Sequence, residues 1–203
     1  MYASALTTQS GAPYGLGRIS HRAPGSTSYI YDTTAGSGVT VFVIDTGILI
    51  SHSQFGGRAR WGANFVDSSN TDGNGHGTHC AGTIGGSTYG VAKAASLVAV
   101  KVLSASGSGS NSGVISGIQW AVTNKTPRSV ISMSLGGGYS AATNTAVRNA
   151  VNAGVTVVVA AGNENQNAAN VSPASETSVI TVGATDSNDN RASFSNFGSV
   201  LDM

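Results

Sequence analysis

The feature that most constrains this chain is a regular alternation between short β-branched apolar runs and longer stretches whose apolar residues recur at helical spacing. The runs predict five strands, over residues 39–44, 97–102, 130–134, 155–160 and 179–182. The intervening stretches predict two helices, over 112–124 and 141–153, and Gly154 ends the second. Strands that alternate with helices pair in parallel and are buried on both faces. The sequence therefore predicts an α/β fold with a mainly parallel central sheet flanked by helices.

The length of 203 residues fits one such domain, and no internal repeat or linker divides the chain. We therefore expect a single domain over residues 1–203. The first 38 residues contain Pro13, Pro24 and several glycines with little periodicity. We expect them to wrap the surface before the sheet begins.

Charged residues are scarce: Asp, Glu, Lys and Arg make up 9% of the chain, and the net charge is +1. Nucleic acids and anionic membranes are recognised by clustered basic residues, so we expect neither as a partner. The apolar run over 157–161 is much too short to span a bilayer. Residues 1–4 lack the features of a signal peptide, so we expect any targeting segment to have been removed. The single cysteine, Cys80, permits no internal disulfide.

Polar and glycine-rich segments follow three of the predicted strands. They are Asp45-Thr46-Gly47 after the first strand, Ser134-Leu135-Gly136 after the third and Ala161-Gly162-Asn163 after the fourth. The carboxyl ends of parallel strands meet at one edge of a sheet, where loops from several strands converge. A functional site is therefore expected at this edge.

The segment 72–83 places His76 at the start of a helix after a glycine-rich run. In one interpretation His76 is a general base that takes a proton from a hydroxyl nucleophile, and the Asp45 carboxylate orients its ring. In another, His76, His79 and Cys80 lie on one helical face and bind zinc, although the sequence offers no obvious fourth ligand. Spacing alone does not decide between the two.

Two other patterns are weaker. Asp45-Thr46-Gly47 is typical of aspartic proteases, but those enzymes need a pair of such elements and this chain has one. The glycine-rich stretch 107–113 does not have the dinucleotide-binding spacing G-x-G-x-x-G. Residues 106–110 fit an exposed edge strand that accepts an extended peptide, or else a flexible loop.

Six segments resemble, in the right order, motifs of the subtilisin family of serine peptidases: 43–47, 72–83, 134–140, 160–163, 172–175 and 192–196. Segments 75–83, 89–93 and 194–202 are most similar to the proteinase K branch of that family. The similarity runs from about Ala12 to the last residue, and residues 12–19 resemble the start of a mature enzyme. We therefore expect no pro-segment in this chain and an N-terminal extension over residues 1–11.

The resemblance implies a three-layer subtilisin-like fold and a secreted endopeptidase that cleaves polypeptides bound in extended form. It implies that Asp45 and His76 are the acid and base of an Asp-His-Ser triad and that the Asn163 side chain is an oxyanion-hole donor. It also implies a set of substrate-binding residues with an apolar or aromatic preference beside the cleaved bond. These are Gly107, Ser108 and Gly109 on one side, Ser134, Leu135 and Gly136 on the other, and Ala160 and Gly162 in a pocket wall.

The same resemblance implies a structural Ca²⁺ site formed by the Asp202 carboxylate and the backbone carbonyls of Thr177 and Val179, an oxygen set that suits calcium. The alternative is that Asp202 is an ordinary loop carboxylate. Cys80 matches a free thiol behind the catalytic imidazole, so we expect it to be buried rather than a cysteine nucleophile. We further expect a monomer without an organic cofactor, inhibited by its own pro-segment and located outside the cell or, alternatively, in a vacuole.

The Gly-Thr-Ser-Met-Ala segment that presents the nucleophile in the family does not occur in these 203 residues. Ser193, Ser195 and Ser199 lie in a strand-turn context and are poor substitutes. We therefore expect a truncated peptidase domain whose serine lies beyond Met203, and no activity from this chain alone. The alternatives from other classes are a peptide-binding pseudoprotease and a zinc-binding module.

Overall fold

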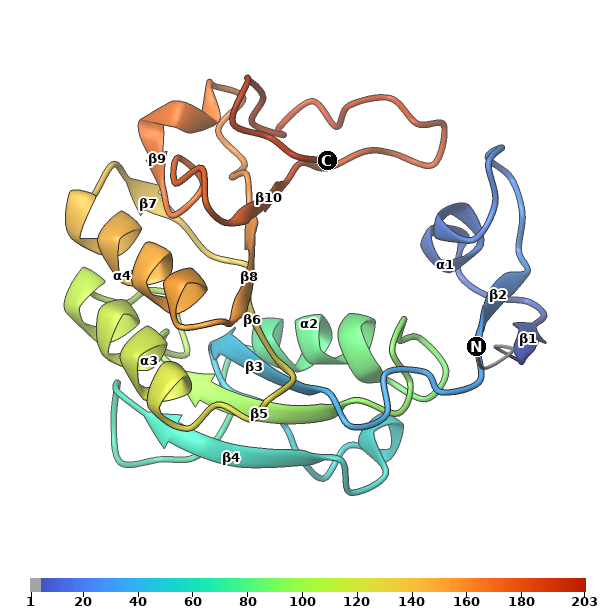
Figure 1. Ribbon diagram of the computed structural model, residues 1–203, viewed down its shortest axis with the longest axis horizontal. Coiled ribbons are helices and arrows are strands. Elements are labelled where there is room, and N and C mark those ends of the chain that lie inside the picture. Colours follow the sequence, from blue (N-terminus) through green and yellow to red (C-terminus); the bar gives the residue numbers. More distant parts are fainter. Residues whose placement is uncertain (1–4) are drawn as a thin grey trace.

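The computed structural model describes residues 5–203 and shows a three-layer α/β fold (Figure 1). At its centre lies one six-stranded sheet in the order β10-β8-β6-β3-β5-β4, in which every neighbouring pair is parallel. The strands are β3 (Thr40–Asp45), β4 (Ala59–Asn64), β5 (Ser96–Lys101), β6 (Ser129–Met133), β8 (Thr156–Ala160) and β10 (Ile180–Val182). The predicted parallel sheet is confirmed.

Helices cover both faces of this sheet. Helices α3 (Asn111–Thr123) and α4 (Ala141–Asn152) lie on one face, and α2 (His76–Gly85) lies on the other (Figure 1). One apolar cluster, around Phe42 and Ile118, fills the space beneath α3 and α4. A second, around Val43 and Leu97, fills the space beneath α2. Because β3 contributes to both clusters, all six of its residues are buried, and its sequence is therefore a nearly continuous apolar run.

The five predicted strands and two predicted helices agree with the structure to within one residue at each end. Strand β4 was not predicted. It lies at the edge of the sheet, where only one neighbour pairs with it, and Arg60, Gly62 and Asn64 interrupt its apolar residues. An edge strand needs less apolar character than a central one because one side faces solvent.

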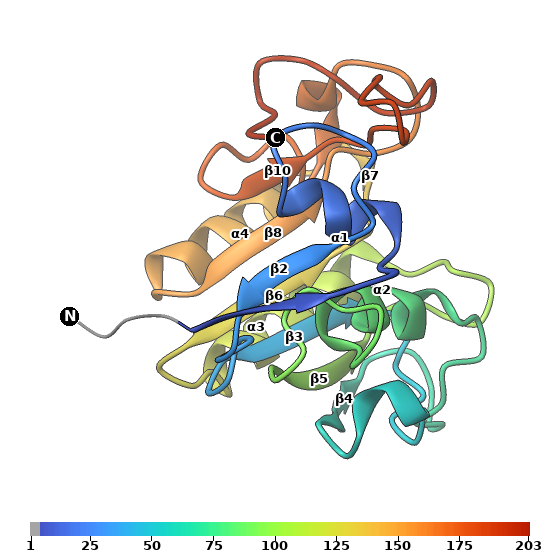
Figure 2. The same cartoon turned by 90° about the vertical axis from the view of Figure 1, so that its right-hand side faces the viewer.

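The first 38 residues lie outside the central sheet, as expected, but they hold regular structure that was not predicted. Strands β1 (Leu6–Gln9) and β2 (Tyr29–Asp32) pair antiparallel around the short helix α1 (Tyr14–Ile19). Figure 2 shows this hairpin in front of the central sheet. The Tyr29 hydroxyl donates to the Val91 carbonyl over 2.7 Å, which ties the hairpin to the segment that precedes β5. Residues 1–4, part of the expected N-terminal extension, lie outside the described residues.

Short elements complete the fold. Strand β7 (Gly137–Gly138) pairs antiparallel with β9 (Val171–Ser172), and two 3-10 helices span Ser53–Phe55 and Ala168–Asn170. Within residues 5–203 no helix is both long enough and apolar enough to cross a membrane.

The order of the strands determines where a site can form. From β3 the chain proceeds to β4 and β5 on one side of the sheet, and then crosses to β6, β8 and β10 on the other. The loops that leave β3 and β6 therefore diverge, and in open parallel sheets such a switch point leaves a crevice at the carboxyl ends of the strands. Asp45 ends β3 and Ser134 follows β6.

Candidate active site

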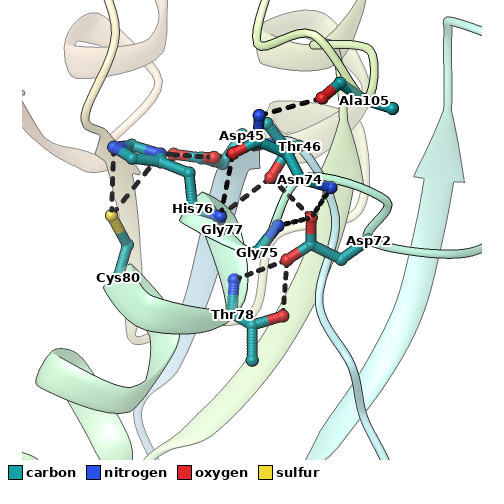
Figure 3. Close-up of polar contacts among 10 residues, drawn as sticks. All are labelled: Asp45, Thr46, Asp72, Asn74, Gly75, His76, Gly77, Thr78, Cys80 and Ala105. Atoms are coloured by element: carbon teal, nitrogen blue, oxygen red, sulfur yellow. Dashed lines mark hydrogen bonds and ion pairs between the residues drawn. The ribbon is translucent and has the colours of Figure 1, made fainter.

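Asp45 and His76 are in direct contact at the carboxyl edge of the sheet (Figure 3). His76 Nδ1 lies 2.8 Å from Asp45 Oδ1 and 2.9 Å from Oδ2. The Asp45 side chain is 1% exposed, whereas that of His76 is 47% exposed. A buried carboxylate on Nδ1 fixes the tautomer of the ring and stabilises the imidazolium, and it leaves Nε2 as the nitrogen that can exchange a proton with a bound group.

The contact depends on a close approach of helix α2 to the end of β3. At Gly77, the second residue of the helix, an added Cβ would lie 2.1 Å from the Gly47 carbonyl oxygen and 3.1 Å from Asp45 Oδ1. Only glycine therefore allows this separation. The Gly77 amide donates to Thr46 Oγ1 over 2.9 Å, so the residue after Asp45 also binds the first turn of the helix.

A second carboxylate, Asp72, joins the strand end to the helix (Figure 3). It accepts hydrogen bonds from Thr46 Oγ1 (2.8 Å), Gly75 N (2.8 Å), Thr78 N (3.0 Å) and Thr78 Oγ1 (2.5 Å). Partial burial acts to raise the pKa of Asp72, but the bonds from Thr78, Gly75 and Thr46 outweigh it, so the pKa is lowered. Asp72 therefore remains a carboxylate at neutral pH. Its negative charge also interacts favourably with the positive, N-terminal end of the dipole of helix α2.

This role of Asp72 was not predicted from the sequence. The available signal was an acidic residue four positions before a helix start, a position from which a side chain can satisfy the exposed amides of the first turn. Its contact with Thr46, 26 residues away, could not be read from local sequence.

Cys80 lies one helical turn beyond His76, with its Sγ 3.8 Å from Nδ1 and 3.9 Å from Nε2. The thiol is partly rather than fully buried, which corrects the expectation of a buried side chain. Burial, with the nearby Asp45 charge, raises the pKa of Cys80 to about 11. The sulfur is therefore protonated at neutral pH, which argues against a cysteine nucleophile.

The zinc set proposed from the sequence is not the one that the structure brings together. Among the described residues, the ligand atoms that cluster within 4.8 Å belong to Asp45, His76 and Cys80. His79 is exposed and is not part of this group. The alternative trio of His76, His79 and Cys80 is therefore not assembled, because the ligand atoms of His76 and Cys80 cluster with the Asp45 carboxylate and not with His79.

A cleft of about 450 Å³ opens beside His76. The predicted substrate segments line its walls, Gly107, Ser108 and Gly109 from one loop and Ser134, Leu135 and Gly136 from the other. Its remaining lining residues are Thr46, Asn74, Leu103, Asn111, Val114, Gly137 and Ser172. The cleft thus combines apolar side chains with small residues whose backbone a ligand can approach.

Of the two alternatives for residues 106–110, an edge strand and a loop, the structure shows a loop. Residues 104–108 form a turn closed by bonds from Gly107 N to Ser104 O (2.9 Å) and from Ser104 N to Ser108 O (2.8 Å). Gly107 has a φ of +79°, which a strand does not allow. Residues 108–110 then lead into α3 without pairing to another strand.

The remaining predicted substrate residues lie outside this cleft. Ala160 ends β8, and the loop that follows contains Gly162 and the exposed Asn163. None of the three lines the cleft beside His76. The loop is joined to β10 by a bond of 2.8 Å from Ala161 N to Val182 O.

The three predicted calcium ligands lie on neighbouring segments around β10. Thr177 and Val179 belong to the turn that leads into the strand, and Asp202 lies beside it. Asp202 Oδ2 accepts from Thr181 N over 2.8 Å, and Asp202 N donates to Thr181 O over 2.9 Å. The donors are all oxygens, as calcium prefers, and this pairing holds the Asp202 carboxylate against Thr181 of β10, two residues after Val179.

Ser195, one of the serines considered as a substitute nucleophile, is 1% exposed. Its hydroxyl donates to the Asn196 carbonyl and accepts from the Ala184 amide, each over 2.9 Å. It therefore has a structural role. Neither it nor Ser193 or Ser199 lines the cleft beside His76.

Comparison with known proteins gives a consistent result. The chain is 65% identical over 203 residues to subtilisin-like protease 2 of Pseudogymnoascus destructans, covering 99% of this chain and 51% of that protein. It is 55% identical over 206 residues to subtilisin-like protease 3 of Arthroderma benhamiae, covering 98% and 52% respectively. The chain thus spans about half the length of the curated relatives it matches.

A solved structure supports the same assignment. The crystal structure of a cold adapted subtilisin-like serine proteinase superimposes with a TM-score of 0.92 and 52% sequence identity, over 95% of this chain and 71% of that one. The model of the subtilase family matches residues 36–203, which include the whole central sheet and the Asp45–His76 pair. The chain belongs to the subtilase family of peptidases.

Proposed function

We propose that the protein to which this chain belongs is a secreted serine endopeptidase that works through an acyl-enzyme. The observation that carries this proposal is the hydrogen-bonded pair of a buried Asp45 and a half-exposed His76 beside a cleft. Family membership supports it, since the relatives are themselves subtilisin-like proteases. The nucleophilic serine is proposed to lie outside these 203 residues, because the Gly-Thr-Ser-Met-Ala segment that presents it in the family does not occur in them. None of the three serines considered as substitutes, 193, 195 and 199, lines the cleft.

In the proposed reaction, His76 Nε2 takes the proton of the serine hydroxyl as its oxygen attacks the carbonyl carbon of the peptide. The C–N bond then breaks, and the same nitrogen returns the proton to the leaving amine. Water replaces the amine in a second round, and the serine is regenerated. Asp45 holds Nδ1 throughout, and the amide of the exposed Asn163 is proposed to donate to the oxyanion.

We propose that substrates are polypeptides bound in extended form between the loops 107–109 and 134–136. Both lie on the walls of the cleft and offer backbone groups with small or no side chains. Leu103, Leu135 and Val114 make part of the cleft apolar, which favours apolar side chains near the cleaved bond. Ala160 and Gly162 are proposed to complete a pocket wall.

The test is irreversible labelling of the full-length protein by a serine-directed fluorophosphonate, followed by peptide mapping. If the protein is a serine peptidase, its activity should fall in proportion to the labelling of one serine. The His76→Ala variant should be inactive and should not be labelled. A pseudoprotease would bind a peptide substrate without hydrolysis and without labelling. That result would exclude the proposed reaction.

Cys80 gives a separate prediction. A mercurial that binds Sγ, 3.8 Å from Nδ1 of His76, should displace the imidazole and inhibit the full-length enzyme. Cys80→Ala should be as active as the wild type and insensitive to the mercurial. Because the pKa of the Cys80 thiol is about 11, alkylation by iodoacetamide should be slow at pH 7. Its rate should rise with pH until the pH reaches about 11. Mercurial inhibition that persists in Cys80→Ala would contradict this assignment.

We propose that Asp202 and the carbonyls of Thr177 and Val179 hold a structural calcium ion, supported by their oxygen chemistry and their positions around β10. Calcium that binds only the folded state raises the melting temperature. Removal by a chelator should therefore lower the melting temperature of the full-length protein, and Asp202→Asn should reduce this response. Asp186→Asn, in an exposed loop, is the matched control. An unchanged melting temperature would show that Asp202 is an ordinary loop carboxylate.

Secretion, a monomeric state and inhibition by a cleaved pro-segment complete the proposal. They are supported by the resemblance to the proteinase K branch. Detection of activity in culture medium, sedimentation of the purified protein and inhibition by the separately expressed pro-segment test the three in turn.

A further inference from the structure

We infer that Asn196 is a positioning residue that fixes the loop carrying Asn163, an inference that rests on the proposed function. Asn196 is 0% exposed, and its side chain lies against the loop 161–166, some thirty residues earlier in the chain. Buried amides are costly unless they are hydrogen-bonded. The question is therefore what this amide holds in place.

The Asn196 side chain makes four hydrogen bonds, all to this loop. Its Oδ1 accepts from Glu164 N and Gln166 N, each over 3.0 Å. Its Nδ2 donates to Ala161 O over 2.8 Å and to Glu164 Oε2 over 2.6 Å. Its backbone N donates to Gly162 O over 3.0 Å. Donors and acceptors from both sides of Asn163 therefore converge on one residue.

Asn163 itself is connected through Glu164. The Glu164 Oε2 atom that accepts from Asn196 Nδ2 also accepts from Asn163 N over 3.1 Å. The backbone of Asn163 is thus held, while the residue is exposed. This is the arrangement that a preorganised hydrogen-bond donor requires.

The packing around this clamp, meaning Asn196 and Glu164, leaves no spare room. Gly162 has a φ of +101°, and an added Cβ there would lie 2.3 Å from Asn196 Nδ2 and 2.6 Å from Glu164 Oε2. Asn196 is in turn anchored through Ser195, whose hydroxyl bridges the Asn196 carbonyl and the Ala184 amide just after β10. The loop that carries Asn163 is thereby connected to the central sheet through Asn196 and Ser195.

The hydrogen bonds of Asn196 and Glu164 should affect how well the transition state is stabilised. An oxyanion-hole donor acts only when it lies within hydrogen-bond distance of the developing charge, and a displacement of about 1 Å can cost about 10²-fold in rate. Loosening the clamp should therefore lower kcat more than it raises KM.

The experiment uses Asn196→Asp in the full-length protein. This change keeps the size of the side chain and its two accepted bonds, but places a carboxylate oxygen where Nδ2 faced two other oxygens. We expect kcat per titrated active site to fall by about 10- to 100-fold while KM changes by less than about 3-fold. Asn188→Asp makes the same chemical change at an exposed position and should keep wild-type kcat. If Asn196→Asp does not fold, Glu164→Ala removes part of the clamp at an exposed residue.

A double-mutant cycle separates positioning from general structural damage. In an Asn163→Ala background, the clamp no longer has a donor to place, so Asn196→Asp should lower kcat by less than about 3-fold. An equal loss in both backgrounds would overturn the inference, as would full activity of Asn196→Asp in an active enzyme. An inactive wild type would instead refute the proposed function, and the inference with it.

Discussion

His76→Ala should reduce kcat of the full-length enzyme about 10⁶-fold, the size measured for loss of the triad histidine in subtilisin itself. The reason is that Nε2 is proposed both to accept the proton of the nucleophile and to return it to the leaving group, while Asp45 already occupies Nδ1 at 2.8 Å. No other titratable side chain lines the described cleft. The measurement is kcat with a chromogenic peptide, corrected for the fraction of folded protein.

His79→Ala is the matched control for that substitution. His79 lies on the same helix and is exposed, so its removal should leave kcat near the wild-type value. If both variants lost activity equally, the effect would come from damage to helix α2. If His76→Ala kept more than about a hundredth of the wild-type rate, His76 would not be the base.

Asp45→Asn should reduce kcat about 10⁴-fold, again a magnitude known for loss of the triad aspartate in subtilisin. The asparagine has nearly the same shape, but its amide can donate to Nδ1. The ring proton would then move to Nε2, which could no longer accept the proton of the serine. Affinity for substrate should hardly change, because Asp45 is buried beneath the imidazole.

Asp189→Asn serves as the control for Asp45→Asn. Its ion pair with Arg18 is exposed on both sides, and such pairs contribute little to stability. Its kcat should equal that of the wild type. A loss of less than about 100-fold in Asp45→Asn, with the fold intact, would show that orientation of the ring does not depend on this carboxylate.

The sequence predicted the parts of the fold in which a local pattern reflects burial. Strand β3 is enclosed on both faces, so its apolar run is visible without knowledge of its neighbours. Strand β4 and helix α1 could not be found in this way. Arg60 and Gly62 interrupt the edge strand, and the hairpin relies on a small cluster of Ala12, Leu16 and Tyr29.

The same distinction applies to the site. Asp45 and His76 were identified through motifs with a recognisable order, and the structure brings them into contact. Asp72 and Asn196 were not identified, because their function lies in hydrogen bonds to residues 26 and about 30 positions away. A buried polar residue carries no local sequence signal that says which distant backbone groups it satisfies.

The position of β3 between two core clusters has a consequence for how the site responds to heat. The amide hydrogens of β3 should exchange with solvent only when the whole domain unfolds, since both faces of the strand are packed. The loop around Asn163 is exposed and is held by hydrogen bonds and not by packing on both faces, so its amides should exchange through local opening. On warming, the proposed oxyanion donor, Asn163, would then be displaced while the Asp45–His76 pair is still intact. Turnover would decline several degrees below the temperature at which the sheet melts.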